Sequence, residues 1–348
     1  MIYLDNAAAQ PPLQIAIYAM NSVLNETWAN PNSAHVAGQK AYTLLRECRE
    51  TVARCLGCLP SEVIFTSSAS EAASLAMRAL YMTCANITVG ATEHDAVART
   101  PWNADDPCRP LYDNFSRKNG FARMLANNET GEIYGEVKNM RRNYPDDVIF
   151  TDATAAVGHI PVDFGELGVD YLCADGMKFG AVPGCGVLVV RGDAIPPFDI
   201  MHRPTPPLAL IAAFSAALEK RVSELPESAL RVKNMREEME KRLLQVPGAK
   251  LNALRASRLP GYINMSFFGV EGAALAGFLS QHGVCVSTGA ACSSGDLAPS
   301  RVLLAAGYDE QRARSSIRIS IGEENTPYEC TRAAELIAAA VSHLRDIS

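Results

Sequence analysis

The sequence predicts an α/β fold, with a mainly parallel central sheet in a large domain and a smaller α+β domain. Strand-like and helix-like stretches alternate through most of the 348 residues, which is typical of βα units that build parallel sheets. Prolines at Pro196-Pro197 and Pro204–Pro207 end this alternation. A chain of this length is long enough for about two domains. We therefore expect the smaller domain to begin near residue 222.

Short apolar runs bounded by turn residues predict the strands, and apolar residues at helical spacing predict the helices. In Ala37–Leu56, for instance, Ala41, Leu45 and Val52 share one face, and Gly57 ends the helix. The expected strands are Val63–Thr66, Asn86–Val89, Arg123–Ala126, Val148–Thr151, Tyr171–Ala174 and Gly186–Val190. The expected helices are Ala37–Leu56, Ser70–Met82, Leu208–Arg221, Ser228–Leu244 and Tyr328–Leu344.

The composition is that of an ordinary globular protein and argues against several classes of function. A net charge of −6 gives no excess of positive charge with which to bind nucleic acid or an anionic membrane. No apolar run is long enough to span a bilayer, and the first residues lack a basic region and include Asp5, so we expect neither a membrane span nor a signal peptide. We interpret the ten cysteines as reduced thiols and expect a cytoplasmic protein.

Cys55 and Cys58 have the spacing of a metal-binding or redox pair. Neither a second such pair nor a histidine cluster accompanies them. We therefore expect no metal site.

Asp152 and Lys178 each follow a predicted strand. Ligands collect at the carboxyl ends of strands in open α/β sheets, and a lysine there is costly to bury without a chemical reason. An aspartate and a lysine in this order suggest pyridoxal 5′-phosphate (PLP), with the lysine as the Schiff base and the aspartate on the pyridine nitrogen. Ordinary charges at the sheet edge are the alternative.

Further polar residues follow other predicted strands. Ser67–Glu71 opens a helix whose free amides could attract a phosphate, or whose serines could simply cap it. His94 could stack on an aromatic ring or transfer protons, or lie in an ordinary loop. Asn127 and Asn128 could bind a cofactor or a carboxylate, or form a turn.

Two residues in the C-terminal part are candidates for substrate chemistry. Cys292 lies among glycines and small hydroxyl residues in Val286–Gly295, a context that suits a thiol reaching a substrate. A spare thiol in a flexible loop is the alternative. Arg318 is flanked by apolar residues and needs an anion, which could be a substrate carboxylate or the partner in a structural salt bridge.

Taken in order, these segments resemble the cysteine desulfurases, which are class V PLP enzymes of fold type I. The resemblance covers essentially the whole chain, and the ordered set is far more specific than any single motif. It implies a PLP-binding large domain of residues 13–221, a small domain of residues 1–12 and 222–348 that carries the cysteine loop, and a homodimer. The motifs are Tyr3–Ala8, Asn30–His35, Ile64–Ser67 with Glu71-Ala72, Glu93-His94, Asn127–Gly131, Asp152-Ala153, Lys178, Ser287–Gly295 and Ser315–Arg318.

The resemblance also implies a role for each matching residue. Lys178 would bind the cofactor and move the substrate's α-proton, and Cys292 would attack the substrate sulfur, which releases alanine and leaves a persulfide for an acceptor or scaffold protein in iron–sulfur cluster assembly. The expected cofactor-binding residues are Lys178, Asp152, His94, Asn128, Ser70, Ala69 and Thr205, with His94 also catalytic. The expected substrate-binding residues are Arg318, Asn128 and Asn30.

The sequence departs from this family at the cofactor. Ala155 replaces the usual glutamine, and Asp175-Gly176-Met177 replaces the Ser-x-His that precedes the lysine and binds phosphate. An ionised Asp175 would repel a phosphate unless it points elsewhere. Arg203-Pro-Thr205 is also a shortened form of the family's glycine-rich segment.

Three functions remain open from the sequence. The first is a PLP-dependent desulfurase acting on L-cysteine. The second is a related PLP enzyme, either a selenocysteine lyase or a class V aminotransferase. The third is a cofactor-poor interaction protein that keeps the fold.

Overall fold

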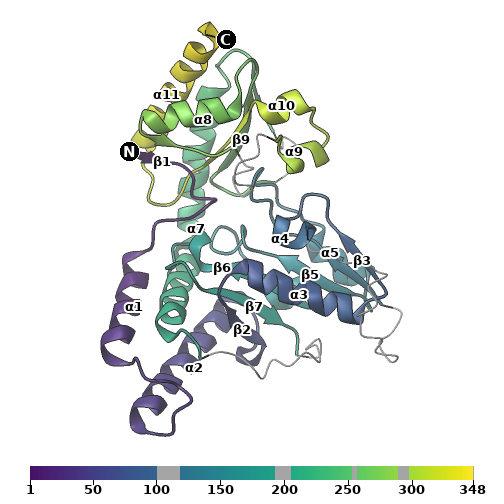
Figure 1. The fold of residues 1–348 in the computed structure, drawn as a ribbon, viewed down its shortest axis with the longest axis vertical. Coiled ribbons are helices and arrows are strands. Elements are labelled where there is room, and N and C mark those ends of the chain that lie inside the picture. The colour runs from purple at the N-terminus through teal and green to yellow at the C-terminus, as the bar shows by residue number, and fades with distance from the viewer. Residues whose placement is uncertain (100–117, 193–204, 253–256, 289–297, 348) are drawn as a thin grey trace. The chain divides into compact units, whose positions relative to one another are not determined.

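The computed structural model describes residues 1–99, 118–192, 205–252, 257–288 and 298–347, which form two compact units (Figure 1). The larger unit comprises Pro11–Leu125 and Gly135–Glu224. The smaller unit comprises Met1–Gln10, Ala126–Tyr134 and Leu225–Ser348.

The larger unit is built on a six-stranded sheet with the strand order β2-β7-β6-β5-β4-β3. Strands β3 to β6 run parallel, whereas β7 is antiparallel to both of its neighbours. The connection from β6 to β7 contains only a short 3-10 helix, too little chain for a parallel crossover. The strands are β2 (Val63–Thr66), β3 (Asn86–Val89), β4 (Asn119–Ala122), β5 (Val148–Asp152), β6 (Tyr171–Asp175) and β7 (Gly186–Val190).

Helices cover both faces of this sheet. Helix α3 lies across β6 and β7 (Figure 1). Its alanines and Met77 join a core with Phe150 and Leu188. Side chains alternate between faces along a strand, so Ile64 packs against this core while Phe65 contacts Phe214 of α7 (Leu208–Leu243). The helices are α1 (Gln14–Glu26), α2 (Val36–Leu56), α3 (Ala69–Thr83), α4 (Asp95–Ala98), α5 (Val137–Asn143), α6 (Phe164–Leu167) and the first part of α7, with 3-10 helices η1 (Pro60–Glu62) and η2 (Gly176–Lys178).

The predicted α/β class and mainly parallel sheet are confirmed, and five of the six expected strands agree within one residue. The strand expected at Arg123–Ala126 was placed wrongly, because β4 ends at Ala122. Arg123 and Leu125 still donate backbone hydrogen bonds to the carbonyls of Phe150 and Asp152 in β5. The apolar pattern at Arg123–Ala126 therefore marked the end of the hydrogen-bonded pairing between β4 and β5 rather than its middle.

The expectation of two helices on either side of Pro226 was also wrong. One helix, α7 (Leu208–Leu243), contains the proline. Proline inside a helix removes a hydrogen bond and costs about 3 kcal/mol or more, which is why the sequence suggested a break. Buried side chains on both sides, Leu218, Leu225 and Val232, stabilise the continuous helix by tertiary packing.

The smaller unit combines an antiparallel sheet with helices. Strands β8 (Ala249–Leu251), β9 (Tyr262–Phe267) and β11 (Ser316–Ser320) form the sheet in the order β11-β9-β8, and β1 (Ile2–Tyr3) pairs in parallel with β10 (Val284–Cys285). The second part of α7 packs with these strands and with α11 in one apolar core. The other helices are α8 (Gly272–Gln281), α9 (Arg301–Ala305), α10 (Glu310–Arg314) and α11 (Pro327–Asp346).

The units differ from the sequence-based domain division in one segment. Ala126–Tyr134 belongs to the smaller unit, whereas we expected it in the large domain. Its backbone explains this assignment, because Ile133 donates to Ser257 and Gly131 accepts from Leu259. The remaining boundaries move by only two or three residues.

The expected end of α2 at Gly57 is confirmed, with the glycine in the left-handed region at φ +66°. Burial raises the pKa of Cys55 to about 11 and that of Cys58 to about 12, which suppresses thiolate chemistry at this pair. Over the ranges that the structure describes, no cluster of three metal-ligating side chains was found and no helix has the length and apolar character to cross a membrane.

Histidine 159 gives the larger unit a specific acid sensitivity. Its Nε2 lies 3.0 Å from the carbonyl oxygen of Lys178, which can only accept, so the ring is a neutral donor. Burial and the nearby Arg221 lower the pKa of His159 to about 4, from 6.5. A depressed pKa gives stability that is present above pH 6.5 and is lost as the pH falls toward 4.

We therefore expect the free energy of unfolding to fall between pH 6.5 and pH 4 in the unmodified protein and to fall less in His159→Gln. The two decreases should differ by up to about 3 kcal/mol. Urea unfolding at a series of pH values measures this difference. His282→Gln is the matched control, since the ring of His282 is exposed. Parallel stability curves for His159→Gln and the unmodified protein would contradict the interpretation.

Candidate active site

The predicted site residues fall into two groups, one in each unit. In the larger unit, the parallel strands β3 to β6 end at the same edge of the sheet. Asp152 is the last residue of β5, Lys178 follows β6 by three residues, and His94 follows β3. An acid, an amine and an imidazole therefore share one sheet edge, the usual place for a ligand in such folds.

Asp152 is held as a buried, oriented carboxylate. It is 8% exposed, and its Oδ1 accepts hydrogen bonds from the Thr154 amide (2.9 Å) and the Cys173 thiol (3.4 Å). Cys173 lies opposite Asp152 in the register of β5 and β6. Burial raises the pKa of the Cys173 thiol well above its usual value, so the thiol keeps its proton as a donor.

Lys178 ends η2, and its backbone is fixed from two sides. His159 donates to its carbonyl, and Arg221 Nε donates to the carbonyl of the next residue, Phe179, at 3.0 Å. Arg221 is itself almost fully buried. Lys178 is half-buried, and its fixed backbone defines the position from which the side chain extends.

His94 caps α4 and is oriented by its backbone neighbours. Its Nδ1 accepts a hydrogen bond from the Ala96 amide at 3.1 Å, so in the neutral ring the proton lies on Nε2. Glu93 is buried, and its Oε1 accepts from the Met124 amide at 2.9 Å. This bond ties the segment after β3 to the segment after β4. The sequence motif included Glu93, but its anchoring role came only from the structure.

The N-terminus of α3 lies at the same edge and has an unexpected partner. The Ala69 amide donates to Oδ2 of Asp175 at 2.8 Å, and the Met177 amide donates to Oδ1 at 3.1 Å. Asp175 is 6% exposed. The helix also has its own cap, because Ser68 Oγ accepts from the Glu71 amide. Ala69 and Ser70, both expected to bind phosphate, thus begin a helix that already holds a carboxylate.

In the smaller unit, Arg318 lies in β11 and is 3% exposed. Its Nη2 donates to Oδ1 of Asp5 at 2.7 Å, and its Nη1 donates to the carbonyl of Asn128 at 3.0 Å. Its Nε has no hydrogen-bond partner among the described residues. A buried donor of this kind can serve a carboxylate. The sequence did not identify Asp5 as the partner, although Asp5 belongs to the Tyr3–Ala8 motif.

The two adjacent asparagines have different roles. Asn127 is fully buried, and its Oδ1 accepts from the amides of Glu129 and Thr130, so it forms the turn. Asn128 is half-buried and contacts Arg318 through its backbone. The sequence treated the pair as equivalent.

Cys292 lies outside the described residues. On its N-terminal side, Ser287 exchanges two backbone hydrogen bonds with Arg318. On its C-terminal side, Ser300 caps α9 and donates to Oε2 of the buried Glu129 at 2.5 Å. Both flanks are therefore attached to the segments that surround Arg318 and Asn128.

Two other expected site residues are exposed. Asn30 lies between α1 and α2, where its side chain accepts from the Asn32 amide. Thr205 lies three residues before α7. Neither has a hydrogen bond or ion pair with the predicted site residues in the part of the chain that the structure describes.

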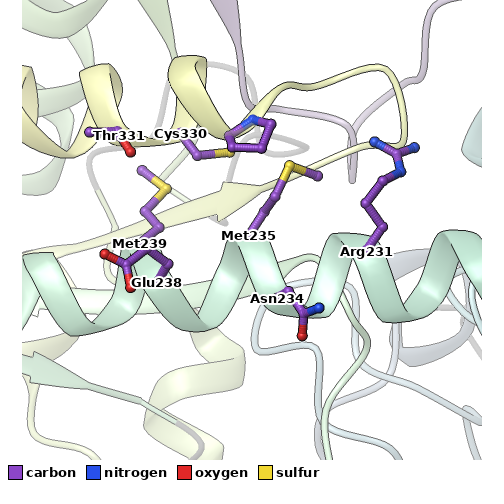
Figure 2. A pocket seen from close by; sticks show the side chains of 8 residues that line it. Arg231, Asn234, Met235, Glu238, Met239, Cys330 and Thr331 are labelled. Carbon is purple, nitrogen blue, oxygen red and sulfur yellow. The ribbon is translucent and has the colours of Figure 1, made fainter.

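A cavity of about 230 Å³ lies in the smaller unit between α7 and α11 (Figure 2). Methionine and cysteine side chains face one another across it, and Arg231 and Glu238 lie at its ends (Figure 2). It contains none of the predicted site residues. Its lining residues are Arg231, Asn234, Met235, Glu238, Met239, Pro327, Cys330 and Thr331.

Comparison with known proteins adds independent information. The chain matches the aminotransferase class-V family over residues 2–105, 117–204 and 199–332. It is 33% identical to a protein named cysteine desulfurase IscS from Dictyoglomus turgidum, with 100% of this chain and 96% of the relative covered. It is 32% identical to an IscS-like cysteine desulfurase from Mycobacterium tuberculosis, with 99% and 97% covered.

Solved structures agree with these matches. A structure described as a NIFS-like protein superposes with a TM-score of 0.85 at 26% identity, with 99% of this chain and 100% of that chain covered. A NifS-like protein from Rickettsia africae has a TM-score of 0.84 at 24% identity, with 99% of each chain covered, and supports the fold.

Proposed function

Because the chain belongs to the aminotransferase class-V family, and within it to the cysteine desulfurases, we propose that it converts L-cysteine to L-alanine with PLP and collects the sulfur on Cys292. The match to curated cysteine desulfurases along the whole chain is the observation that carries this proposal. The larger unit then serves as the cofactor-binding domain, and the smaller unit serves as the domain that contains Cys292.

Three residues at the sheet edge of the larger unit fit the ring of PLP. Asp152 is a buried carboxylate that can hold a proton on the pyridine nitrogen. Lys178 supplies the amine for covalent attachment, and His94 presents Nε2–H from a fixed ring. When bound, PLP supplies an electron sink for charge that develops at the substrate's α-carbon.

The protein's own side chains perform the other steps. Lys178 moves a proton at the α-carbon, and His94 moves a proton at the substrate sulfur. Arg318 binds the substrate carboxylate, for which its buried Nε is a donor beside the Asp5 pair. Among the expected contacts, Asn128 assists Arg318, while Asn30 and Thr205 remain proposed binding residues.

Sulfur transfer takes place between Cys292 and the bound substrate and depends on the proton transfers by Lys178 and His94. The Cys292 thiolate attacks the sulfur of bound L-cysteine, so a sulfur–sulfur bond forms and the carbon–sulfur bond breaks. The electron pair of the broken bond goes to the β-carbon, which takes up a proton and becomes the methyl group of alanine. L-Cysteine plus the Cys292 thiol gives L-alanine plus the Cys292 persulfide. Atoms and electrons balance without a further oxidant, and the outer sulfur is available to an acceptor or scaffold protein in iron–sulfur cluster assembly.

We also propose a homodimer in the cytoplasm. Several large apolar side chains on α1, α2 and their connection are exposed, including Tyr18, Trp28 and Val36, which supports an interface there. Every cysteine of the described residues is a free thiol, which is consistent with a reducing compartment.

Incubation of the purified protein with PLP, L-cysteine and a reducing thiol tests the activity. We expect alanine and sulfide in equal amounts, because each carbon–sulfur cleavage yields one of each. L-Serine is the matched control substrate and should give no alanine, since it lacks the sulfur that Cys292 accepts. An absence of alanine in protein that has bound PLP would contradict the proposed reaction.

A further inference from the structure

The N-terminus of α3 holds an internal anion where a bound phosphate would need the same donors. The Ala69 amide is the first of the helix, and it donates to Asp175. Amides at a helix N-terminus carry partial positive charge and favour an anion. The Asp175 carboxylate, nearly fully buried, already provides that anion.

Asp175 is fixed in this position from both sides. It ends β6, and its other oxygen accepts from the Met177 amide, so it caps η2 and contacts α3 at once. Glu71 adds a second carboxylate to the same turn, because its Oε2 accepts from the amide and hydroxyl of Ser67. A phosphate here would have to displace Asp175 from Ala69 and would meet like charge.

We propose that Asp175 determines the cofactor preference of this protein: it fills the anion position at α3, so the phosphate of the cofactor contributes little to binding. The inference rests on the proposed function, because it concerns the same cofactor. The pyridine ring is then held mainly by the residues at the ends of β3, β5 and β6. Phosphorylated and unphosphorylated forms of the ring should bind with similar affinity.

Pyridoxine and pyridoxine 5′-phosphate are suitable probes, because they differ only in the phosphate and cannot react with Lys178. Calorimetric titration of the full chain gives the ratio of their dissociation constants. We expect the ratio to be within about tenfold for the unmodified protein, and Asp175→Ser to shift it by about ten- to a hundredfold in favour of the phosphate ester. Asp175→Asn, which keeps the shape, should shift it in the same direction by less.

Asp163→Ser is the matched control. Asp163 caps α6 in the same unit, where its Oδ1 accepts from the Glu166 amide at 2.8 Å, so its loss removes a comparable cap. We expect its ratio to equal that of the unmodified protein. Circular dichroism establishes that each variant is folded.

Two results would overturn the role of Asp175. One is a preference of the unmodified protein for the phosphate ester by more than about a hundredfold, and the other is an unchanged ratio in both folded Asp175 variants. These titrations involve no turnover. Failure of the proposed desulfurase reaction would instead appear as missing alanine, whichever form of the ring binds.

Discussion

Lys178→Ala is expected to lower alanine formation from L-cysteine by about a thousandfold or more. The substitution removes both the amine that attaches the cofactor and the base that moves the α-proton. The backbone of this residue is held by His159, and Arg221 holds the neighbouring carbonyl of Phe179, so the loss should arise from the amine rather than from misfolding. A coupled assay for alanine measures the rate.

Borohydride reduction provides a second readout of the same variant. In the unmodified protein incubated with PLP, reduction should attach the cofactor covalently to Lys178, so that the mass of the peptide containing this residue increases by that of the cofactor. The corresponding peptide of Lys178→Ala should show no such increase. Lys220→Ala is the control, because Lys220 is a partly exposed lysine of the same unit that pairs with Glu224 on α7. A variant without Lys178 that kept more than about a tenth of the rate would rule out the assigned role.

Cys292→Ala is expected to abolish persulfide formation and to lower sulfide release by about a thousandfold or more. The thiolate is the nucleophile that accepts sulfur, and no other group in the proposed reaction can replace it. Alkylation of the persulfide followed by peptide mass analysis locates the transferred sulfur.

The same variant separates a desulfurase from a class V aminotransferase. Transamination moves an amino group and needs no sulfur nucleophile, so amino transfer to pyruvate should be unaffected by Cys292→Ala. Cys285→Ala is the control, because Cys285 is a free, partly buried thiol in β10 of the same unit. If sulfide release persisted in Cys292→Ala but was lost in Cys285→Ala, the sulfur acceptor would be Cys285 rather than Cys292.

The fold was largely predictable because its elements follow local rules. Strands such as Val63–Thr66 and Gly186–Val190 are short apolar runs bounded by turn residues, and both agree with the structure. Local rules failed where tertiary packing opposes them. Pro226 remains inside α7, because buried side chains on both sides of it stabilise the helix.

The candidate site was predictable in residue type but not in contacts. Arg318 was expected to need an anion, and the structure provides Asp5, which lies 313 positions away along the chain. The pair Asn127 and Asn128 was found from its place after a strand. Only the tertiary structure shows that Asn127 forms a buried turn and that Asn128 accepts a hydrogen bond from Arg318 through its backbone.

The sequence by itself determined the alternation of strands and helices in the larger unit, the family, and which reactive groups follow the strands of that unit, because periodicity and motif spacing are local properties. Only the tertiary structure decided what Asp175 does. Its carboxylate could have faced solvent, yet folding brings it to the Ala69 amide, 106 positions away, and buries both. A buried carboxylate must find donors. One donor, the Met177 amide, is local in the sequence, whereas the other lies at the start of a helix that no local pattern could connect to Asp175.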